Sequence, residues 1–191
     1  MNIGVLALQG DFIEHVGVLH TIGVTPSLVR LPGDLLGLDG LIIPGGESTT
    51  IGKLAEAFGL IHPLREFSKT HAIWGTCAGA IFLSKDAHRD QPLLHLMDIT
   101  VERNAFGRQV DSFEIDLPVP FFEDGQEHPY HAIFIRAPII KSVAGEAGAL
   151  LTLPDGRIVA AQQGKLLATS FHPELTPDTR FHQYFVALAR S

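Results

Sequence analysis

The chain has 191 residues, of which 46% are hydrophobic and 18% charged, and its net charge is −7. This length predicts a single domain, residues 1–191, that is large enough to bury its own core. The acidic balance and the lack of a Lys/Arg cluster exclude nucleic acid as the main ligand, because phosphate binding needs a basic face. No apolar run approaches the length of a membrane span. The single cysteine, Cys77, excludes an internal disulfide framework and fits a reducing, cytoplasmic setting.

The first half of the chain alternates apolar runs with helical patterns, which predicts parallel strands with helices on both faces of a sheet. Buried strands are expected at 3–8, 27–30, 38–44 and 72–75. Helices are expected from Asp11 to Gly23, from Thr49 or Thr50 to about Gly59, over about 61–69, and from Gly79 to about Lys85. In the first helix, Asp11 and Glu14 resemble a capping box. The expected buried stripe of that helix is Ile13, Val16, Leu19 and His20.

The second half of the chain predicts strands with few helices between them. They are expected at 99–102, 109–116, 132–136, 149–153, 157–162 and 166–171. A final helix is expected to run to about Ala189, with Pro177 at its first position. Residues 118–131 have the weakest pattern and are expected to form a surface excursion. The prediction is a three-layer α/β domain with a mostly parallel central sheet and added antiparallel strands.

The strongest chemical signal is Gly75-Thr76-Cys77-Ala78-Gly79, which follows a buried strand and precedes a helix. That context is the one that a nucleophile elbow requires, because the glycines leave room for a sharp turn. The helix N-terminus favours a reactive thiolate at Cys77. The amide of Ala78 is then expected to donate to an oxyanion.

A cysteine nucleophile needs a base and a group that orients the base. His172 and Glu174 offer both, because residues two apart in an extended segment project to the same side. The other histidines, including His15 and His20, lack such a setting. No metal site is predicted, since the sequence has neither a cysteine cluster nor a helical His-x-x-x-His pair.

The segment Pro44–Thr50 is glycine-rich and lies between a strand and a helix. A phosphate loop is rejected, because Gly52-Lys53 is followed by Leu54 and the position five before Gly52 is Glu47 rather than Gly. Gly46 is instead expected to supply a second oxyanion donor, and Glu47 to pair with a substrate ammonium. Two arginines beside apolar residues, Arg103 and Arg136, are suited to carboxylate binding, although surface ion pairs are an open alternative.

Five segments together resemble a known family: GGEST at 45–49, GTCAG at 75–79, ERNAFGRQ at 102–109, FIRAP at 134–138 and SFHPEL at 170–175. GTCAG and HPE alone are typical of class I glutamine amidotransferases in general. The full set resembles the glutaminase subunits of pyridoxal 5′-phosphate synthases, over almost the whole chain. The departure from the family is the longer, proline-rich segment 118–131.

The resemblance implies a flavodoxin-like class I glutamine amidotransferase domain with a triad of Cys77, His172 and Glu174. It implies glutamine contacts from Gly46, Glu47, Ser48, Arg103, Ile135 and Arg136, and an oxyanion hole made by Gly46 and Ala78. The implied partner is a TIM-barrel synthase subunit, in a large hetero-oligomer, that makes pyridoxal 5′-phosphate from ribose 5-phosphate, glyceraldehyde 3-phosphate and ammonia.

The expected reaction is hydrolysis of L-glutamine to L-glutamate and ammonia through a cysteinyl thioester, with no metal or organic cofactor. Two other enzymes are alternatives: the glutaminase subunit of another synthase, and a cysteine hydrolase on the same fold. An acidic ammonium-binding loop with two arginines suits a free amino acid better than a peptide. A non-catalytic regulatory module is disfavoured by the intact Cys, His and Glu set.

Overall fold

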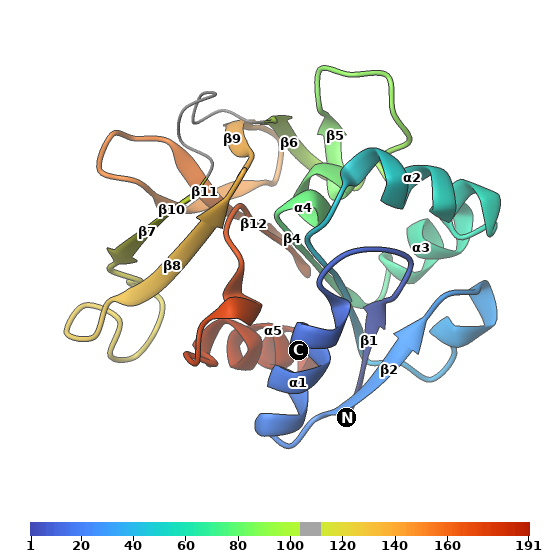
Figure 1. Cartoon of the computed structure of the whole chain (residues 1–191), viewed down its shortest axis with the longest axis horizontal. Helices are drawn as coiled ribbons and strands as arrows, with labels where there is room; N and C mark the ends of the chain where they lie inside the picture. The colour runs from blue at the N-terminus through green and yellow to red at the C-terminus, as the bar shows by residue number, and fades with distance from the viewer. Residues whose placement is uncertain (104–111) are drawn as a thin grey trace.

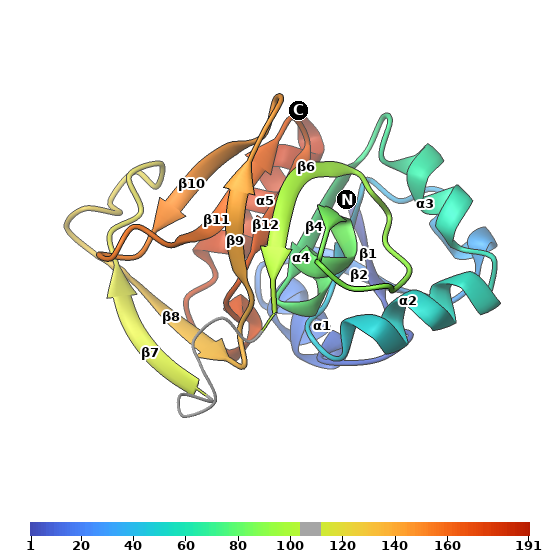
Figure 2. The same cartoon turned by 90° about the horizontal axis from the view of Figure 1, so that it is seen from above.

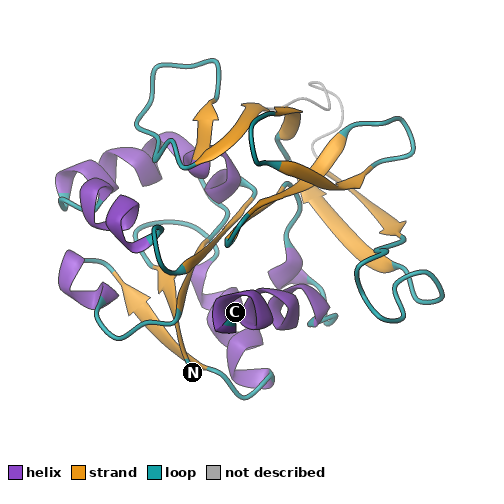
Figure 3. Cartoon of the chain, turned by 180° about the vertical axis from the view of Figure 1, so that it is seen from behind, coloured by secondary structure: helices purple, strands orange, loops and turns teal. Residues whose placement is uncertain are grey.

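The computed structural model describes residues 1–103 and 112–191, which fold into three layers around a central sheet (Figure 1). One face of the sheet is covered by α1 (Phe12–Thr21) and α5 (Arg180–Arg190). The other is covered by α2 (Ser48–Ala57), α3 (Ile61–Phe67) and α4 (Ala78–Leu83), as seen from behind in Figure 3. Each face has its own apolar core. No helix in the described ranges is both long and apolar enough to cross a membrane.

Within the described residues, ten strands form one sheet, and β7 and β8 form a separate pair. The strands are β1 (Asn2–Leu6), β2 (Thr25–Val29), β3 (Gly40–Ile43), β4 (Ala72–Thr76), β5 (Ser84–Asp86), β6 (Met97–Glu102), β7 (Ser112–Leu117), β8 (Tyr130–Ile135), β9 (Ile139–Val143), β10 (Gly148–Thr152), β11 (Ile158–Gln163) and β12 (Leu166–Thr169). Short 3-10 helices occur at Pro32–Leu35 and Pro173–Leu175.

Five neighbouring strands, β2-β1-β3-β4-β12, are all parallel. In chain order of these five this is the 2-1-3-4-5 arrangement of flavodoxin-like domains. Such sheets bind ligands outside the carboxyl ends of their strands. Here those ends lead into Gln9, Gly45, Cys77 and His172. The expected mostly parallel, flavodoxin-like fold is confirmed, and it brings four distant segments to one edge.

The second half adds antiparallel strands at the other side of the sheet. β11 pairs with β12, β9 and β10, and β9 pairs with β6. Figure 2 shows the β7–β8 ribbon beside these strands, far from α2 and α3. Residues 118–129 of the excursion expected at 118–131 join these two strands, whereas Tyr130 and His131 belong to β8. The Phe122 ring of this connection packs 5.0 Å from Phe181 of α5, centroid to centroid.

The structure corrects several local predictions. β5 and β9 were not expected, and α5 begins at Arg180, so Pro177 is not its first residue. Asp11 is the N-cap of α1 but forms no side-chain cap bond, so the capping box with Glu14 is absent.

The buried stripe predicted for α1 was right at Leu19, which is buried, and at Val16, which packs against the core, but wrong at Ile13 and His20. Ile13 is 59% exposed and His20 is also exposed, whereas His15 and Leu19 are buried. His15 is buried because α1 packs this polar residue against groups from the far end of the chain. The strand expected at 109–116 begins outside the described residues. Most of the ERNAFGRQ segment also lies outside them.

Candidate active site

Cys77 lies at a strained elbow between β4 and α4. Its backbone has φ 46° and ψ −104°, a region that non-glycine residues rarely adopt. The Cys77 amide donates to the Thr169 carbonyl of the neighbouring strand at 2.8 Å, and its carbonyl accepts from Ala80 at 3.1 Å. These bonds hold the turn, while the thiol side chain is 7% exposed and lies 3.9 Å from the Ile135 carbonyl oxygen.

The two glycines of the elbow are required by close backbone approaches. A β-carbon on Gly75 would lie 2.4 Å from the Gly79 carbonyl oxygen. A β-carbon on Gly79 would lie 2.0 Å from the carbonyl oxygen of Ile43, at the end of β3. Neither distance is possible without displacing backbone, so the steric reason expected for this motif holds.

His172 and Glu174 lie beside the elbow, where β12 leads into a 3-10 helix. The His172 amide donates to the Ile133 carbonyl of β8 at 2.8 Å, which fixes the backbone. His172 Nδ1 lies 2.7 Å from Glu174 Oε1, and both residues are buried. The carboxylate therefore holds the ring through Nδ1.

The charge of His172 is set by three opposing effects. Burial alone would lower the pKa of its imidazole, but the Cys77 thiol as a hydrogen-bond partner and the Glu174 carboxylate raise that pKa to about 10. Burial in turn raises the pKa of Glu174, against the effect of His172. The arrangement favours an imidazolium that lies between a sulfur and a carboxylate, as a cysteine nucleophile needs.

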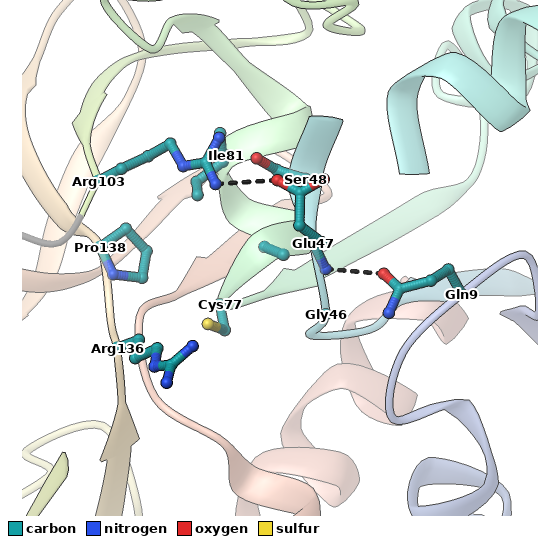
Figure 4. Close-up of a pocket in the computed structure, with 10 residues that line it drawn as sticks. Gln9, Gly46, Glu47, Ser48, Cys77, Ile81, Arg103, Arg136 and Pro138 are labelled. Carbon is teal, nitrogen blue, oxygen red and sulfur yellow. Dashed lines mark hydrogen bonds and ion pairs between the residues drawn. The ribbon is translucent and has the colours of Figure 1, made fainter. Parts of the chain in front are cut away.

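The glycine pair after β3 packs closely against the loop after β1. The Gly45 carbonyl accepts from the Asp11 amide at 3.2 Å. The Glu47 amide donates to Gln9 Oε1 at 2.7 Å, as Figure 4 shows. A β-carbon on Gly45 would lie 2.6 Å from His172 Cε1, so only glycine lets this loop approach the base.

The two donors expected for an oxyanion come from this loop and from α4. Ala78 is the first residue of α4, whose first amides have no partner within the helix. Gly46 has a trans peptide with Gly45, so its amide points opposite to the carbonyl that Asp11 holds. Both residues line the same pocket as Cys77.

Glu47 has a role in the structure that its sequence position did not predict. It is the N-cap of α2, and its carboxylate accepts from the amides of Thr49 and Thr50 at 3.2 and 2.7 Å. It also pairs with Arg103 at 2.9 Å. Burial alone would raise the pKa of Glu47, but bonds from Thr50, Thr49 and Arg103 lower it to about 2. The group expected to meet an ammonium is thus a carboxylate that already has several donors.

A pocket of about 340 Å³ opens at the elbow. It is lined by Gln9, Gly46, Glu47, Ser48, Cys77, Ala78, Ile81, Arg103, Arg136 and Pro138. In Figure 4 the Arg103 and Arg136 side chains approach it from different sides, with Cys77 between them and the glycine loop. Every glutamine contact expected from the sequence lines this pocket except Ile135, whose carbonyl faces the sulfur.

Sequence reasoning missed four polar residues of this region. Gln9 and Asp11 hold the glycine loop, and Gln91 accepts from Thr49 Oγ1 at 3.1 Å and from Arg103 at 3.2 Å. His15 lies 3.4 Å from Glu174 Oε2. No motif marks these residues. The only signal available for Gln9 and Asp11 was their position directly after a buried strand, where ligand-binding loops occur.

Asp11, His172 and Glu174 have possible metal-ligand atoms that lie within 4.8 Å of one another. The Nδ1 atom of His172 is nevertheless engaged by Glu174 at 2.7 Å, in the geometry of a base and its orienting carboxylate. The same atoms cannot serve both purposes, and the adjacent cysteine explains their arrangement without a metal.

A model of the SNO glutamine amidotransferase family matches residues 5–190. The chain belongs to this family. It is 56% identical to the pyridoxal 5′-phosphate synthase subunit PdxT of Herpetosiphon aurantiacus, over 98% of this chain and 100% of that protein. It is 54% identical, with the same coverage, to the subunit of the same name from a Roseiflexus species.

Solved structures agree with this family assignment. A crystal structure of a glutamine amidotransferase superposes with a TM-score of 0.92 at 48% identity, covering 99% of both chains. A putative GMP synthase subunit from Thermoplasma acidophilum reaches 0.69 at 19% identity, which shows the fold alone. The resemblance drawn from the five segments is confirmed, and these relatives give no support to a different synthase or to another cysteine hydrolase.

Proposed function

We propose that this member of the SNO glutamine amidotransferase family hydrolyses L-glutamine to L-glutamate and ammonia, and supplies the ammonia to a synthase subunit for pyridoxal 5′-phosphate biosynthesis. The observation that carries the proposal is the elbow cysteine beside a buried His172–Glu174 pair, at the mouth of a pocket sized for a small molecule. The names of the relatives, which span their full length, support the pathway.

The reaction follows from the geometry. The Cys77 thiolate attacks the side-chain amide carbon of glutamine, and the amides of Gly46 and Ala78 donate to the oxygen that becomes negative. Protonated His172 gives its proton to the departing nitrogen, which leaves as ammonia. A thioester remains, and neutral His172 then takes a proton from water as the water attacks. Glutamate leaves, and the thiolate and imidazolium are restored.

The two ends of glutamine are assigned to the same pocket. Glu47 and Ser48 would meet the amino group, and an arginine would meet the α-carboxylate. Arg103 is held by Glu47, and Arg136 approaches from the β8 side, so either guanidinium is a candidate. An ammonium would have to share the Glu47 oxygens with Arg103 or replace it.

The proposed partner is a TIM-barrel synthase subunit in a large, cytoplasmic hetero-oligomer, which the sequence resemblance supports. The chemistry gives a reason for a partner, because ammonia released without an acceptor would waste glutamine.

The test is release of ammonia from glutamine by the purified chain, with and without the synthase subunit. Cys77→Ala should abolish turnover, and Glu174→Ala should reduce kcat strongly but less completely. A glutamine analogue with an electrophilic carbon should label Cys77. Unchanged turnover in the Cys77→Ala variant would overturn the mechanism.

A further inference from the structure

His15 of α1 is a buried histidine that contacts three other elements at the site. Its Nδ1 lies 2.9 Å from His182 Nε2 of α5. Its Nε2 lies 3.2 Å from the hydroxyl of Thr76, the residue before the nucleophile, and 3.4 Å from Glu174 Oε2. His15, Thr76 and His182 are all 0% exposed, so water does not compete for these contacts.

Glu174 uses only one of its oxygens for His172. The other, Oε2, is buried and has no hydrogen-bonding partner of good geometry among the described residues. His15 Nε2 is the nitrogen that faces it. A buried carboxylate oxygen without a donor is costly, so the protonation of His15 decides how well this carboxylate is held.

The contacts select one tautomer of His15. If its proton is on Nδ1, its Nε2 lone pair faces the Glu174 carboxylate, and the remaining proton of His182 must lie on its buried Nδ1, which has no partner in the described part of the chain. If its proton is on Nε2, that N–H donates to the Thr76 hydroxyl at 3.2 Å and lies near Glu174 Oε2, and His182 donates from Nε2 to His15 Nδ1. Only an acceptor on His182 Nδ1 is then left unpaired, and an unpaired buried acceptor is tolerated more often than an unpaired donor.

Both imidazoles remain neutral in this environment. Burial, with smaller contributions from His182 and His172, holds the pKa of His15 well below its ordinary value. Burial also lowers the pKa of His182 to about 3. His15 therefore offers Glu174 a neutral donor, which leaves the carboxylate charge to stabilise protonated His172.

We propose that His15 is a positioning residue of the glutaminase reaction: its tautomer is fixed by His182, its Nε2–H donates to the Thr76 hydroxyl, and the same N–H, 3.4 Å from the second oxygen of Glu174, attracts that oxygen electrostatically, so that the first oxygen stays aligned on His172. The inference rests on the proposed triad. It extends that triad into α1 and α5, which the sequence motifs do not reach.

The decisive experiment compares two substitutions that remove the same ring. Gln carries its amide nitrogen near the position of histidine Nε2, whereas Asn carries its own near Nδ1. His15→Gln should therefore keep kcat within a few-fold of wild type, because a donor still reaches Glu174. His15→Asn should lower kcat on the order of 10²-fold with KM for glutamine unchanged, the scale expected when a catalytic group is misplaced. Both are assayed as ammonia release by the complex with the synthase subunit.

A second measurement reports on the site without turnover. Cys77 is the only cysteine in the chain, so iodoacetamide alkylation of the full chain measures the reactivity of that thiol. His15→Asn should slow alkylation at neutral pH and shift its pH dependence, because a poorly held Glu174 stabilises the His172 cation less. His20→Asn, at an exposed position of the same helix, is the matched control and should change neither readout.

The two His15 variants and Cys77→Ala together distinguish failure of the His15 proposal from failure of the proposed function. Equal loss in His15→Gln and His15→Asn, in step with their melting temperatures, would show a packing role and overturn the proposal. Wild-type activity in His15→Asn would also overturn it, while an inactive Cys77→Ala would leave the triad standing. An active Cys77→Ala would instead defeat the proposed function itself.

Should neither His15 variant fold, His182→Phe tests the same step from α5, since it removes the donor that fixes the tautomer. A smaller fall in kcat with slower alkylation supports the proposal. Unchanged kcat and alkylation overturn it.

Discussion

At the scale of single residues, the elbow depends on positions where no β-carbon fits. Cys77 keeps a positive φ because its neighbours on both sides are backbone atoms in close contact. Strain of this kind persists only where the surroundings impose it. The glycines that allow the turn are therefore as important to the chemistry as the sulfur.

Gly79→Ala should lower both stability and activity, because its β-carbon would meet the Ile43 carbonyl oxygen at 2.0 Å. We expect a loss of about 1–3 kcal/mol in the free energy of unfolding, measured by urea denaturation, as for overpacked sites. Gly17→Ala on α1 is the control: nothing lies within 4 Å of its β-carbon, so it should stabilise the helix by about 0.5–1 kcal/mol. Unchanged stability and activity in Gly79→Ala would show that α4 and the end of β3 can move apart.

Removal of either arginine of the pocket should weaken glutamine binding. Arg103 holds Glu47, Thr49 and Gln91, so Arg103→Ala should raise KM for glutamine and also lower the melting temperature. Arg136→Ala should also raise KM for glutamine, if its guanidinium binds the substrate carboxylate. Steady-state kinetics and thermal melting of both variants check this. Unchanged KM in both, with lower melting temperatures, would make the arginines structural.

At the scale of elements, α1 and α5 meet through two buried histidines, which makes their packing sensitive to acid. Burial lowers the pKa of His182 to about 3 and that of His15 below its ordinary 6.5. Below pH 6.5 the unfolded chain binds protons that the folded chain does not. The free energy of unfolding should therefore fall as pH drops from about 6.5 towards 3, by up to about 1.4 kcal/mol per pH unit for each histidine.

His182→Phe should flatten this dependence, because one of the two depressed histidines is gone. Urea unfolding of both proteins at pH 7 and pH 5.5 measures the difference. His182→Phe also removes the smaller contribution of His182 to the lowered pKa of His15, so the change in slope reports on both buried histidines. Equal pH slopes would mean that His182 is protonated without cost in the folded chain.

The sequence predicted the elements that carry a local signal and missed those set by distant contacts. Gly75 and Gly79 flank the cysteine in sequence, so the elbow could be read directly. His172 and Glu174 are two residues apart in an extended segment, so their pairing could be read as well. The burial of His15 could not be predicted, because the residues that contact it on the buried face of α1, Glu174 and His182, are distant in the sequence. Hydrophobicity alone predicted that Ile13 would be buried, but it is exposed.

The start of α5 shows the same limit. Pro177 suits a first helical position, yet Asp178 instead accepts from the Arg180 amide and guanidinium, and Arg180 reaches Asp124 of the 118–131 segment. The turn that precedes the helix is thus fixed by an ion pair across the fold, which no local pattern encodes.

At the scale of the whole molecule, the site is built at four strand ends, and its residues differ in exposure. Cys77 and His172 are buried, but Gly46 of the glycine loop is exposed. The loop is held through Asp11 and Gln9, both in the segment after β1. A partner that contacts this edge could therefore alter the orientation of the Gly46 peptide without touching Cys77. Differential contact with two loop orientations is sufficient for such control.

We therefore expect the chain alone to release ammonia slowly and the synthase subunit to raise kcat. Oxyanion donors act in the transition state, so the partner should change kcat more than KM. A steady-state assay against titrated synthase subunit, with Cys77→Ala as the blank, measures both. Gln9→Ala, which removes the acceptor for the Glu47 amide, should lower kcat in the complex because the loop loses one of its two anchors. Full activity of the isolated chain, with no rise on adding a synthase subunit that binds, would show that the loop already has its active orientation and that the partner only receives the ammonia.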